Sequence, residues 1–477
     1  MALDIAALLA AADGQGHELF RSHVNPRLAQ VLRTIGFDRD FVRGQGAYLW
    51  DRDGNKYLDM ISGYGVFSVG RNHPDIRDAL ADYMRLDYPS LVQLDTPVIC
   101  GLLADALKKR IPYGLDTVYF TNSGNEGIET AIKYARCATG RSAVLYCHKA
   151  FHGLSNGALS LCGDDSFRKG FGPLLPDCRE IPFDDLVSLE RALGEGDVAA
   201  FVVEPIQGKG VNIPADGYLE QASALCHKHG ALLVADEVQT GIGRTGRFLA
   251  IMHDEGADPD IVVVSKALSG GYVPVGAVLT RRRIYDKVFS SMERAVVHSS
   301  TFGKGGLGMV AGLATLQCID DEALMQNATR IGDRLGEGMR AMAPRFGFIR
   351  DVRWRGAMLA IEFAAAESRS LRSAWTMAHK LDPNLFPQAI TMPLLDKHRV
   401  LTQVAGHNID VIKLLPPLNV SDSDIAWFLD AFEEVMKRLH RFPGPAWEAI
   451  AHIGKSVLRR SGSTARAATR ARPARHP

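Results

Sequence analysis

The sequence lacks the features that define several classes of protein. Its seven cysteines are an odd number and form no CxxC pair, so we expect reduced thiols and no metal centre. No apolar run approaches the roughly 20 residues that cross a bilayer. No basic leader precedes the N-terminal apolar residues, so neither a membrane segment nor a signal peptide is expected. These absences predict a cytoplasmic globular protein, and its formal net charge of +1 gives no overall attraction to nucleic acid.

Acidic residues are also missing after Glu448, where the chain becomes basic. Seven lysines and arginines follow this position, so the remainder of the chain carries about 1 − 7 = −6. Residues 451–477 have too little apolar surface to fold, and we expect a disordered basic tail. Contact between this tail and an anionic partner is the alternative hypothesis.

What is present is a regular succession of short apolar runs and helical segments, from about residue 75 to residue 310. The runs are unbroken rather than alternating, which is typical of strands buried on both faces of a parallel sheet. We therefore predict an α/β fold with a mostly parallel central sheet. The predicted strands are 118–120, 143–146, 200–203, 232–235 and 262–264.

The regions on either side of this segment have a different pattern. Residues 47–50 and 56–59 flank a glycine-containing turn and predict a hairpin. Residues 358–363 predict a strand, and 423–440 predict an amphipathic helix. A chain of this length, 46% hydrophobic, can bury two cores. We predict a large domain over 71–310 and a smaller α+β domain built from 1–70 and 311–450.

Two of the predicted strands end in residues with complementary chemistry. Lys266 follows the run 261–264, and Asp236 follows the run 231–235. A buried lysine amine can bond to the aldehyde of pyridoxal phosphate, and a carboxylate can keep the pyridine nitrogen of that cofactor protonated. The carboxyl ends of parallel strands share one edge of a sheet, so the two side chains are expected to converge. The pair predicts a pyridoxal phosphate site with Lys266 and Asp236 as catalytic residues.

A candidate phosphate-binding turn lies at Ser123, Gly124 and Asn125. Ser123 and Glu126 fit the S-x-x-E capping box, so a helix should begin here with its free amides and positive dipole end facing an anion. Gly124 permits close approach of the backbone to that anion. An ordinary capped helix without a ligand fits the same pattern, and this segment alone leaves both interpretations open.

Further candidates for cofactor binding follow other predicted strands. Phe151 can stack on a planar ring with His152 beside it, although packing in the core explains an aromatic residue here equally simply. Glu204 can orient the residues around the cofactor or cap a loop. Val238 can pack on the face of the ring, and Gln239 can reach the ring hydroxyl oxygen.

Taken together, these segments resemble the class III pyridoxal phosphate-dependent aminotransferases, the ornithine, acetylornithine and 4-aminobutyrate group. The resemblance covers about residues 46–440, and its motifs stand in the order found in that family. They are NSGNE (122–126), FHG (151–153), EPIQG (204–208), DEVQTG (236–241), SK (265–266) and HSSTFG (298–303).

The resemblance implies properties that spacing alone does not give. It implies the fold type I architecture of pyridoxal phosphate enzymes and a homodimer with active sites at the subunit interface. It also implies that Thr301 binds the phosphate of the neighbouring subunit's cofactor. A loop hydroxyl without such a role is the alternative for Thr301.

The substrate-binding candidates come from positions where this chain matches or departs from that family. Tyr64 matches a pocket-lining tyrosine of the ornithine branch, and Phe67 extends an aromatic wall. Lys209 stands in the loop where ornithine-type members carry a glutamate, and Lys413 stands where their carboxylate-gripping arginine usually stands. A lysine lacks the planar fork of arginine and holds a carboxylate less specifically. The glutamate–arginine switch is therefore expected to be absent.

These residues predict an aminotransferase with a ping-pong mechanism. It would move an amino group, terminal (ω) in one partner, between an amine or amino acid and an oxo acid or aldehyde. An aminomutase, racemase or decarboxylase is a second hypothesis, because one scaffold supports several such reactions. A cofactor-binding regulator or scaffold is a third, and the lack of an N-terminal helix-turn-helix segment counts against a transcription factor.

Overall fold

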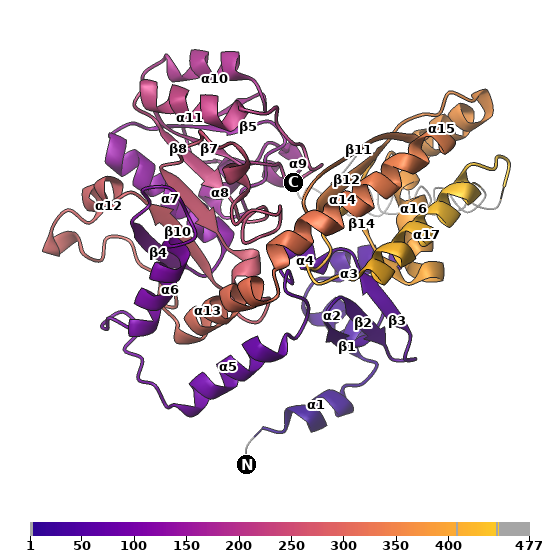
Figure 1. Cartoon of the computed structure of the whole chain (residues 1–477), viewed down its shortest axis with the longest axis horizontal. Helices are drawn as coiled ribbons and strands as arrows, with labels where there is room; N and C mark the ends of the chain where they lie inside the picture. Colours follow the sequence, from indigo (N-terminus) through magenta and orange to yellow (C-terminus); the bar gives the residue numbers. More distant parts are fainter. Residues whose placement is uncertain (1–2, 407–408, 445–446, 448–477) are drawn as a thin grey trace, which may run out of the picture.

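The computed structural model describes residues 3–406, 409–444 and 447. Its largest sheet has seven strands in the order β4-β10-β9-β8-β7-β5-β6 (Figure 1). β10 is antiparallel to both of its neighbours and the other pairs are parallel. The predicted α/β fold with a mostly parallel central sheet is therefore confirmed. The strands are β4 (Thr117–Thr121), β5 (Ala143–Cys147), β6 (Cys178–Ile181), β7 (Val198–Val203), β8 (Leu232–Asp236), β9 (Ile261–Val264) and β10 (Gly276–Thr280).

Every strand predicted for this sheet is present, and β6 and β10 are additions to the prediction. β6 lies at the edge of the sheet, and Arg179 and Glu180 interrupt its apolar pattern. β10 returns antiparallel to β9, and the segment 265–275 between them holds a 3₁₀ turn but no α-helix, so the alternation of helix and strand does not announce it. β6 lacks the unbroken apolar run of a buried strand, whereas β10 has such a run over 277–279, which the prediction missed.

The unbroken apolar runs are explained by burial on both faces of the sheet. In β9, Ile261 and Val263 belong to the cluster under α7 (Gly124–Thr139), whereas Val262 and Val264 belong to the large core on the opposite face. Successive side chains of a strand point to opposite faces, so a strand covered twice must be apolar throughout. A Cβ at Gly127 would lie 2.5 Å from Val263 Cγ1, which shows how closely α7 approaches the sheet.

The N- and C-terminal segments build two smaller sheets. One has the order β1-β2-β3-β13, and the other has the order β11-β12-β15-β14. The predicted hairpin is the antiparallel pair of β2 and β3, and the predicted strand and helix near the C-terminus are β12 and α17. The strands are β1 (Phe41–Gln45), β2 (Tyr48–Asp51), β3 (Lys56–Asp59), β11 (Ile349–Arg355), β12 (Met358–Phe363), β13 (Val400–Leu401), β14 (Gln403–Val404) and β15 (Val411–Leu414).

The parallel pairing of β3 with β13 links the two segments that we assign to one smaller domain. Helix α13 (Gly306–Asp321) crosses the predicted boundary at residue 310 and connects the two parts of the chain. The division into domains stays a proposal.

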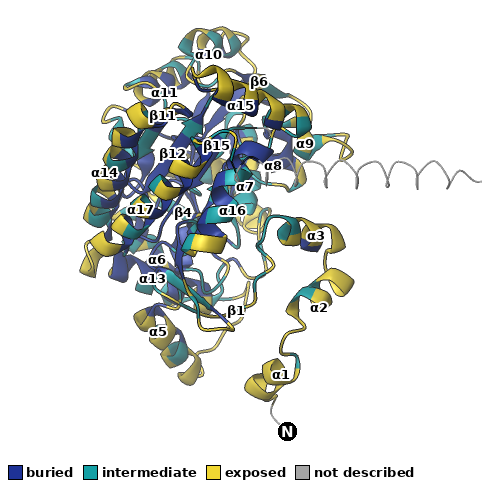
Figure 2. Cartoon of the chain, turned by 90° about the vertical axis from the view of Figure 1, so that its right-hand side faces the viewer, coloured by how far each residue is buried: buried dark blue, intermediate teal, exposed yellow. Residues whose placement is uncertain are grey.

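Helices surround the three sheets. α1, α2 and α3 form an N-terminal arm that projects from the rest of the chain and is largely exposed (Figure 2). The remaining helices are α4 (Ser62–Gly65), α5 (Pro74–Arg85), α6 (Val98–Lys108), α8 (Asn156–Ser160), α9 (Asp165–Arg168), α10 (Leu186–Leu193), α11 (Tyr218–Lys228), α12 (Arg282–Val288), α14 (Leu324–Met342), α15 (Arg369–Leu381), α16 (Leu385–His398) and α17 (Asp422–Leu439). The arm comprises α1 (Ile5–Ala11), α2 (Gly16–His23) and α3 (Pro26–Thr34).

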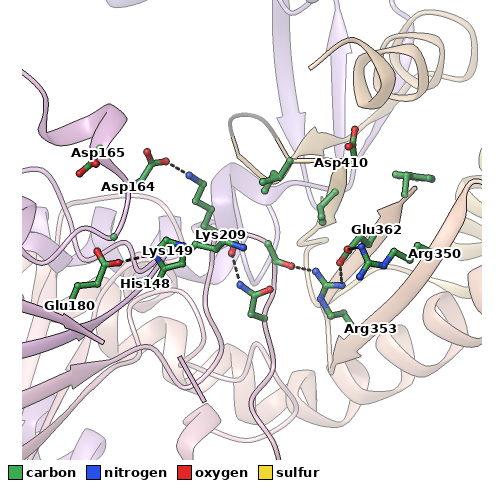
Figure 3. A pocket seen from close by; sticks show the side chains of 16 residues that line it. His148, Lys149, Asp164, Asp165, Glu180, Lys209, Arg350, Arg353, Glu362 and Asp410 are labelled. Atoms are coloured by element: carbon green, nitrogen blue, oxygen red, sulfur yellow. Dashed lines mark hydrogen bonds and ion pairs between the residues drawn. The ribbon is translucent and has the colours of Figure 1, made fainter. Parts of the chain in front are cut away.

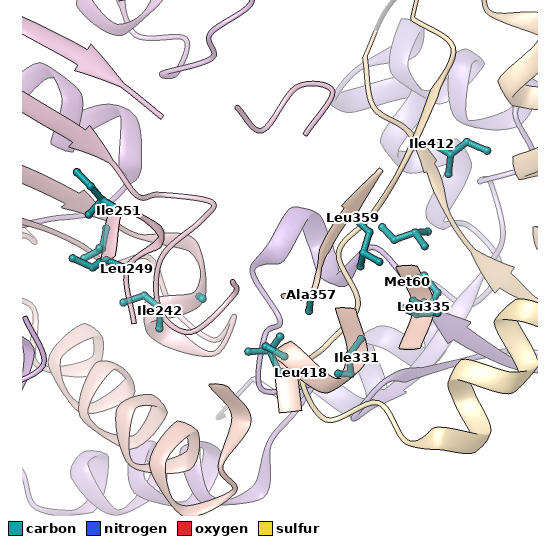
Figure 4. Close-up of a cluster of buried hydrophobic side chains, with 14 of the residues drawn as sticks. Met60, Ile242, Leu249, Ile251, Ile331, Leu335, Ala357, Leu359, Ile412 and Leu418 are labelled. Atoms are coloured by element: carbon teal, nitrogen blue, oxygen red, sulfur yellow. The ribbon is translucent and has the colours of Figure 1, made fainter. Parts of the chain in front are cut away.

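Apolar side chains join the loop after β8 to the C-terminal segment (Figure 4). Ile242 and Leu249 of the loop belong to the same buried cluster as Ile331 of α14 and Leu359 of β12. Arg244, 1% exposed, lies within this loop and donates hydrogen bonds to the carbonyl oxygens of Ala357 and Pro416. It also donates to the hydroxyls of Ser62 and Ser68. The loop is thereby fixed to the neighbouring segments by packing and by a buried cation.

Within the described ranges, no helix is long and apolar enough to cross a membrane. The predicted basic tail, 451–477, lies outside the described residues.

Candidate active site

Three ionisable side chains lie at the carboxyl ends of neighbouring strands. Asp236 is the last residue of β8, and Lys266 begins the single 3₁₀ turn that follows β9. β8 and β9 are parallel neighbours with Asp236 opposite Val263, and Glu204 follows β7 on the other side of β8. The topology therefore delivers these groups to one edge of the sheet, as strand ends in α/β folds do.

Asp236 is buried, and each of its carboxylate oxygens has a partner. Oδ2 lies 2.7 Å from Nδ1 of His152, and Oδ1 accepts a hydrogen bond of 3.1 Å from the amide of Val238. Burial opposes protonation of His152, but the hydrogen bond to Asp236 and the nearby charge of Glu204 outweigh it and raise the pKa of the imidazole. Nε2 of His152 is buried without a hydrogen-bond partner among the described residues.

Lys266 combines strained backbone with an unpartnered amine. Its φ of +33° lies in the left-handed region that non-glycine residues rarely adopt, and such strain often occurs at functional sites. In the described part of the chain its amine makes no hydrogen bond or ion pair. Burial lowers the pKa of Lys266, while Asp236 and Glu204 act in the opposite direction. A lysine of this kind is deprotonated, and hence nucleophilic, at lower pH than an exposed lysine.

Glu204 connects two loops beside these residues. Its Oε2 accepts a hydrogen bond of 3.0 Å from the amide of Phe151, and its Oε1 accepts one of 2.9 Å from the amide of Gly208. Burial raises the pKa of this carboxyl. The ring of Phe151 makes an edge contact with Phe167, 5.4 Å between centroids. The predicted stacking of Phe151 on a cofactor stays a proposal.

The predicted phosphate-binding turn is the N-terminus of α7. Ser123 caps the helix by accepting a 3.4 Å hydrogen bond from the amide of Glu126. The Glu126 carboxylate accepts from the amide of Asn122 rather than from that of Ser123, so the reciprocal bond of the capping box is shifted by one residue. Neither Gly124 nor Asn125 finds an acceptor for its amide within residues 3–406, 409–444 and 447. This end of α7 therefore has free amides that could bind an anion, and the predicted phosphate-binding role stays a proposal.

Close contacts bring other predicted residues to this turn. A Cβ at Gly124 would lie 2.7 Å from the side chain of Val238, and one at Gly153 would lie 2.3 Å from Asn125. Only glycine allows these approaches, so Val238 and the loop after His152 both border the turn.

The segment with Thr301 approaches the same turn. Ser300 Oγ accepts a hydrogen bond of 2.8 Å from Asn122 Nδ2, and a Cβ at Gly303 would lie 2.6 Å from the carbonyl oxygen of Phe120. The side chain of Thr301 itself is exposed. An exposed hydroxyl fits a role toward a second subunit, and that role stays a proposal.

Gln239, Lys413 and Tyr64 form one hydrogen-bonded group. Gln239 Nε2 donates to the carbonyl oxygen of Tyr64 over 3.1 Å, and Gln239 Oε1 accepts from Lys413 Nζ over 3.3 Å. Lys413 also donates to the carbonyl oxygen of Gly208 over 2.8 Å. Burial, with a contribution from Lys266, lowers the pKa of Lys413 to about 7, against the opposing effect of Glu204.

The predicted aromatic wall lies close to the turn after Lys266. A Cβ at Gly271 would lie 2.4 Å from the ring of Phe67, and the guanidinium of Arg71 lies 4.1 Å from the centroid of that ring. The side chain of Tyr64 is 49% exposed, and its hydroxyl accepts a hydrogen bond from Gln403. Phe67 is thus packed against Gly271 and Arg71, whereas about half of Tyr64 is accessible to a ligand.

Lys209 belongs to a different place. Its ammonium pairs with Asp164, and it lines a charged pocket of about 510 Å³ between the large sheet and the β11–β12 hairpin (Figure 3). The lining includes His148 and Glu180 on one side and Arg353 on the other, and it includes neither Lys266 nor Asp236. The structure does not bring Lys209 together with the other substrate-binding candidates.

Some residues that shape the site carry no signal in the sequence. Arg244 holds the loop after Gln239 and was indistinguishable from a surface arginine, since only the fold reveals its burial. Asn122 links the turn to Ser300 through a side-chain contact between residues far apart in the sequence. The ion pair between Lys209 and Asp164, also a contact between distant residues, holds the Lys209 ammonium away from the site.

The residues at the strand ends fit pyridoxal phosphate. The unpartnered Lys266 amine could bond to its aldehyde, the free amides of α7 could hold its phosphate, and Asp236 could face its ring nitrogen. The buried, unpartnered Nε2 of His152 shows that a polar neighbour is missing from this side of the site.

The family model described as aminotransferase class-III matches residues 34–436. A curated relative, the aminotransferase PigE of Serratia sp. (strain ATCC 39006), is 34% identical over 472 residues. The alignment covers 92% of this chain and 55% of PigE, so the chain spans about half the length of that relative.

Two solved enzymes have the same fold. The ornithine aminotransferase of Toxoplasma gondii is 29% identical with a TM-score of 0.80, over 92% of this chain and 99% of that one. A second structure of that enzyme has pyridoxal phosphate at partial occupancy in its active site. The (S)-enantioselective omega-transaminase of Thermomicrobium roseum is 27% identical with a TM-score of 0.77, over 92% of this chain and all (100%) of that one. The expected fold type is therefore confirmed.

Proposed function

Because the chain belongs to the class III aminotransferase family, we propose that it is a pyridoxal phosphate-dependent aminotransferase. It moves an amino group, terminal in one partner, between an amine or amino acid and an oxo acid or aldehyde by a ping-pong mechanism. The observation that carries this proposal is the unpartnered amine of Lys266, a partly buried residue beside Asp236 and Glu204, at the sheet edge where α7 presents free amides.

Each residue of the site has a distinct task in this reaction. The cofactor, when bound, supplies an aldehyde that takes up the amino group and a ring that accepts electrons from the substrate carbon. Lys266 Nζ would hold the cofactor through its aldehyde, and the free amine would move a proton to and from the substrate carbon. Asp236, held by His152 and the amide of Val238, keeps the ring nitrogen protonated. The amides of Gly124 and Asn125 hold the phosphate.

Other predicted residues complete the binding of the cofactor. Phe151 and Val238 border the ring, and Gln239 reaches its hydroxyl oxygen. Glu204 acts through the backbone amides that it holds at Phe151 and Gly208.

A terminal amine as substrate is supported by the surroundings of the two lysines. Neither Lys209, paired with Asp164, nor Lys413, bonded to Gly208 and Gln239, matches the glutamate–arginine arrangement of the ornithine branch. The half-exposed Tyr64 and the neighbouring Phe67 offer apolar surface to an uncharged chain. The solved omega-transaminase with the same fold agrees with this substrate class.

A homodimer is supported by apolar side chains on two surfaces. One is the N-terminal arm, whose helices α1 and α2 have no buried residue. The other joins the segments 91–98 and 292–302, linked by a hydrogen bond from Gln93 to the carbonyl oxygen of Ser300. In this second surface Leu94 is 87% exposed, Met292 95% and Phe302 72%. Contiguous exposed apolar surface marks interfaces, and Thr301 lies within this one. Seven free thiols support a cytoplasmic location.

The test uses the purified protein loaded with pyridoxal phosphate. It is incubated with a series of terminal amines and with pyruvate or 2-oxoglutarate, and the amino acid formed is quantified. We expect the amino acid that corresponds to each oxo acid, together with the aldehyde of the amine. Consumption of a substrate without this amino acid would favour the aminomutase, racemase or decarboxylase hypothesis. Failure to retain the cofactor would contradict all of these functions.

A further inference from the structure

Lys413 is a buried lysine without an anionic partner among the described residues, and burial lowers the pKa of its amine to about 7. Its side chain comes from β15, is 8% exposed, and makes no ion pair with any described residue. Both of its hydrogen bonds go to neutral oxygens, the carbonyl of Gly208 at 2.8 Å and Oε1 of Gln239 at 3.3 Å. A buried charge without a counterion is costly, so its retention requires a role that an apolar residue would not fill.

The two hydrogen bonds determine which way the Gln239 amide points. A lysine ammonium only donates, so Lys413 selects the oxygen end of that amide. The nitrogen end then donates to the carbonyl oxygen of Tyr64 at 3.1 Å, and its second hydrogen is left for a ligand. Space around this arrangement is small, because a Cβ at Gly208 would lie 2.5 Å from Gln239 Oε1 and 3.2 Å from Glu204 Oε1.

We propose that Lys413 is a positioning residue that orients the amide of Gln239 toward the cofactor, rather than the group that binds a substrate carboxylate. This inference rests on the proposed function, because it assumes that pyridoxal phosphate occupies the space between Lys266 and Asp236. It implies that the position of Lys413, where the ornithine branch carries an arginine, does not bind the substrate carboxylate in this chain. The substrate class that follows is one whose recognition does not depend on a carboxylate at Lys413.

The position of Lys413 also affects the amine of Lys266. The positive charges of Lys413 and Lys266 repel each other. Glu204 favours protonation of both lysines, whereas Asp236 favours protonation of Lys266 and also interacts with His152. A neighbouring cation disfavours protonation of Lys266 Nζ, as does burial. Removing Lys413 should therefore let Lys266 keep its proton to higher pH.

The experiment compares Lys413→Met, Lys413→Arg, Gln239→Ala and the double variant Lys413→Met/Gln239→Ala as holoenzymes. Methionine keeps the length of the side chain without a donor, and arginine keeps donors and charge. Substrates are tested in pairs, a primary alkylamine and an ω-amino acid of the same chain length. The pH midpoint of the cofactor's visible absorption band gives a readout that does not depend on turnover.

If Lys413 positions Gln239, Lys413→Met lowers kcat/KM by a similar factor, about tenfold, for the alkylamine and the ω-amino acid. The pH midpoint of the visible absorption band rises by about one unit, because the loss of a neighbouring positive charge stabilises the protonated form of Lys266 Nζ. The double variant is no worse than Gln239→Ala alone, since residues that act through one contact are not additive.

A different pattern would overturn the proposal. If Lys413 grips a carboxylate, Lys413→Met raises KM for the ω-amino acid alone and adds its full loss to that of Gln239→Ala. Should Lys413→Met not fold, Lys413→Arg decides: an equal change of kcat/KM for the two substrates supports positioning, and a lower KM for the ω-amino acid alone, as a planar carboxylate-binding fork would give, contradicts it.

Lys228→Met is the matched control, because Lys228 pairs with Glu190 on the exposed side of α11. It should leave kcat/KM and the midpoint unchanged. Failure of the proposed function is seen separately, since the unsubstituted protein would then show neither the visible band nor transfer of an amino group.

Discussion

Two regions of the molecule contain clusters of ionisable side chains, and they differ in whether these side chains form ion pairs. In the pocket of about 510 Å³ several basic side chains have acidic partners: Lys209 pairs with Asp164, His148 lies 2.7 Å from Glu180, and Arg353 lies 2.6 Å from Glu362. In the other region, Lys266 after β9 is partly buried and Lys413 of β15 is buried, and neither makes an ion pair in the described part of the chain. The pocket holds paired charges, and the strand ends hold the uncompensated groups.

The difference shows which property identifies the site. Compensated pairs with partial exposure to water contribute little and need no further partner. The strand ends combine an unpaired amine, an unpaired imidazole nitrogen and free helix amides in one region. These groups lack hydrogen-bond or bonding partners, and a phosphorylated aldehyde would provide partners for the amine and the amides.

The largest effect is expected from Lys266→Ala, which removes the amine on which this contrast depends. Amino transfer should fall by roughly 10³-fold or more, because both the covalent anchor and the proton carrier are lost. The cofactor should no longer remain attached to the chain after borohydride reduction and denaturation, as mass spectrometry would show. Covalent attachment at an unchanged level would remove Lys266 from its assigned role.

A smaller loss is expected from Asp236→Asn. The amide preserves the shape of the side chain but not the charge that stabilises the protonated ring nitrogen and His152, so kcat should fall by about 10²-fold. Steady-state kinetics across a pH series measures this loss, and circular dichroism checks the fold. Parental kcat in a correctly folded variant would mean that the carboxylate serves structure alone.

Arg244→Met tests the connection between the site and the C-terminal segment. The substitution leaves the carbonyl oxygens of Ala357 and Pro416 and the hydroxyls of Ser62 and Ser68 without their donor. The free energy of unfolding should fall by about 3 kcal/mol, since hydrogen bonds to a charged group are strong and buried acceptors are costly to leave unpaired. Denaturant unfolding measures the change. Unaltered stability would show that the cost of burying the cation cancels its hydrogen bonds.

The sequence predicts those residues of the site that follow the ends of buried strands. The position of Asp236 and Lys266 follows from apolar runs of a parallel sheet, whose carboxyl ends must share an edge. The partners of Lys209 and Lys413 do not follow, because Asp164, Gly208 and Gln239 meet them only through tertiary contacts between distant segments. The antiparallel strand β10 has an apolar run of its own over 277–279, but its antiparallel pairing with β4 and β9 is a tertiary feature that this run does not give.

The smallest effect is expected in the pocket, from His148→Gln. The His148–Glu180 pair is partly exposed, with side chains 58% and 36% accessible, so water compensates for its loss. The free energy of unfolding should change by less than about 1 kcal/mol, and amino transfer should stay parental. Because Glu180→Gln removes the same pair from the other side, its effect should be equally small, and the double variant should be no worse than either single variant. A large loss of amino transfer in either variant, with stability retained, would mean that the compensated pocket takes part in substrate binding and that unpaired charge does not by itself mark the reactive site.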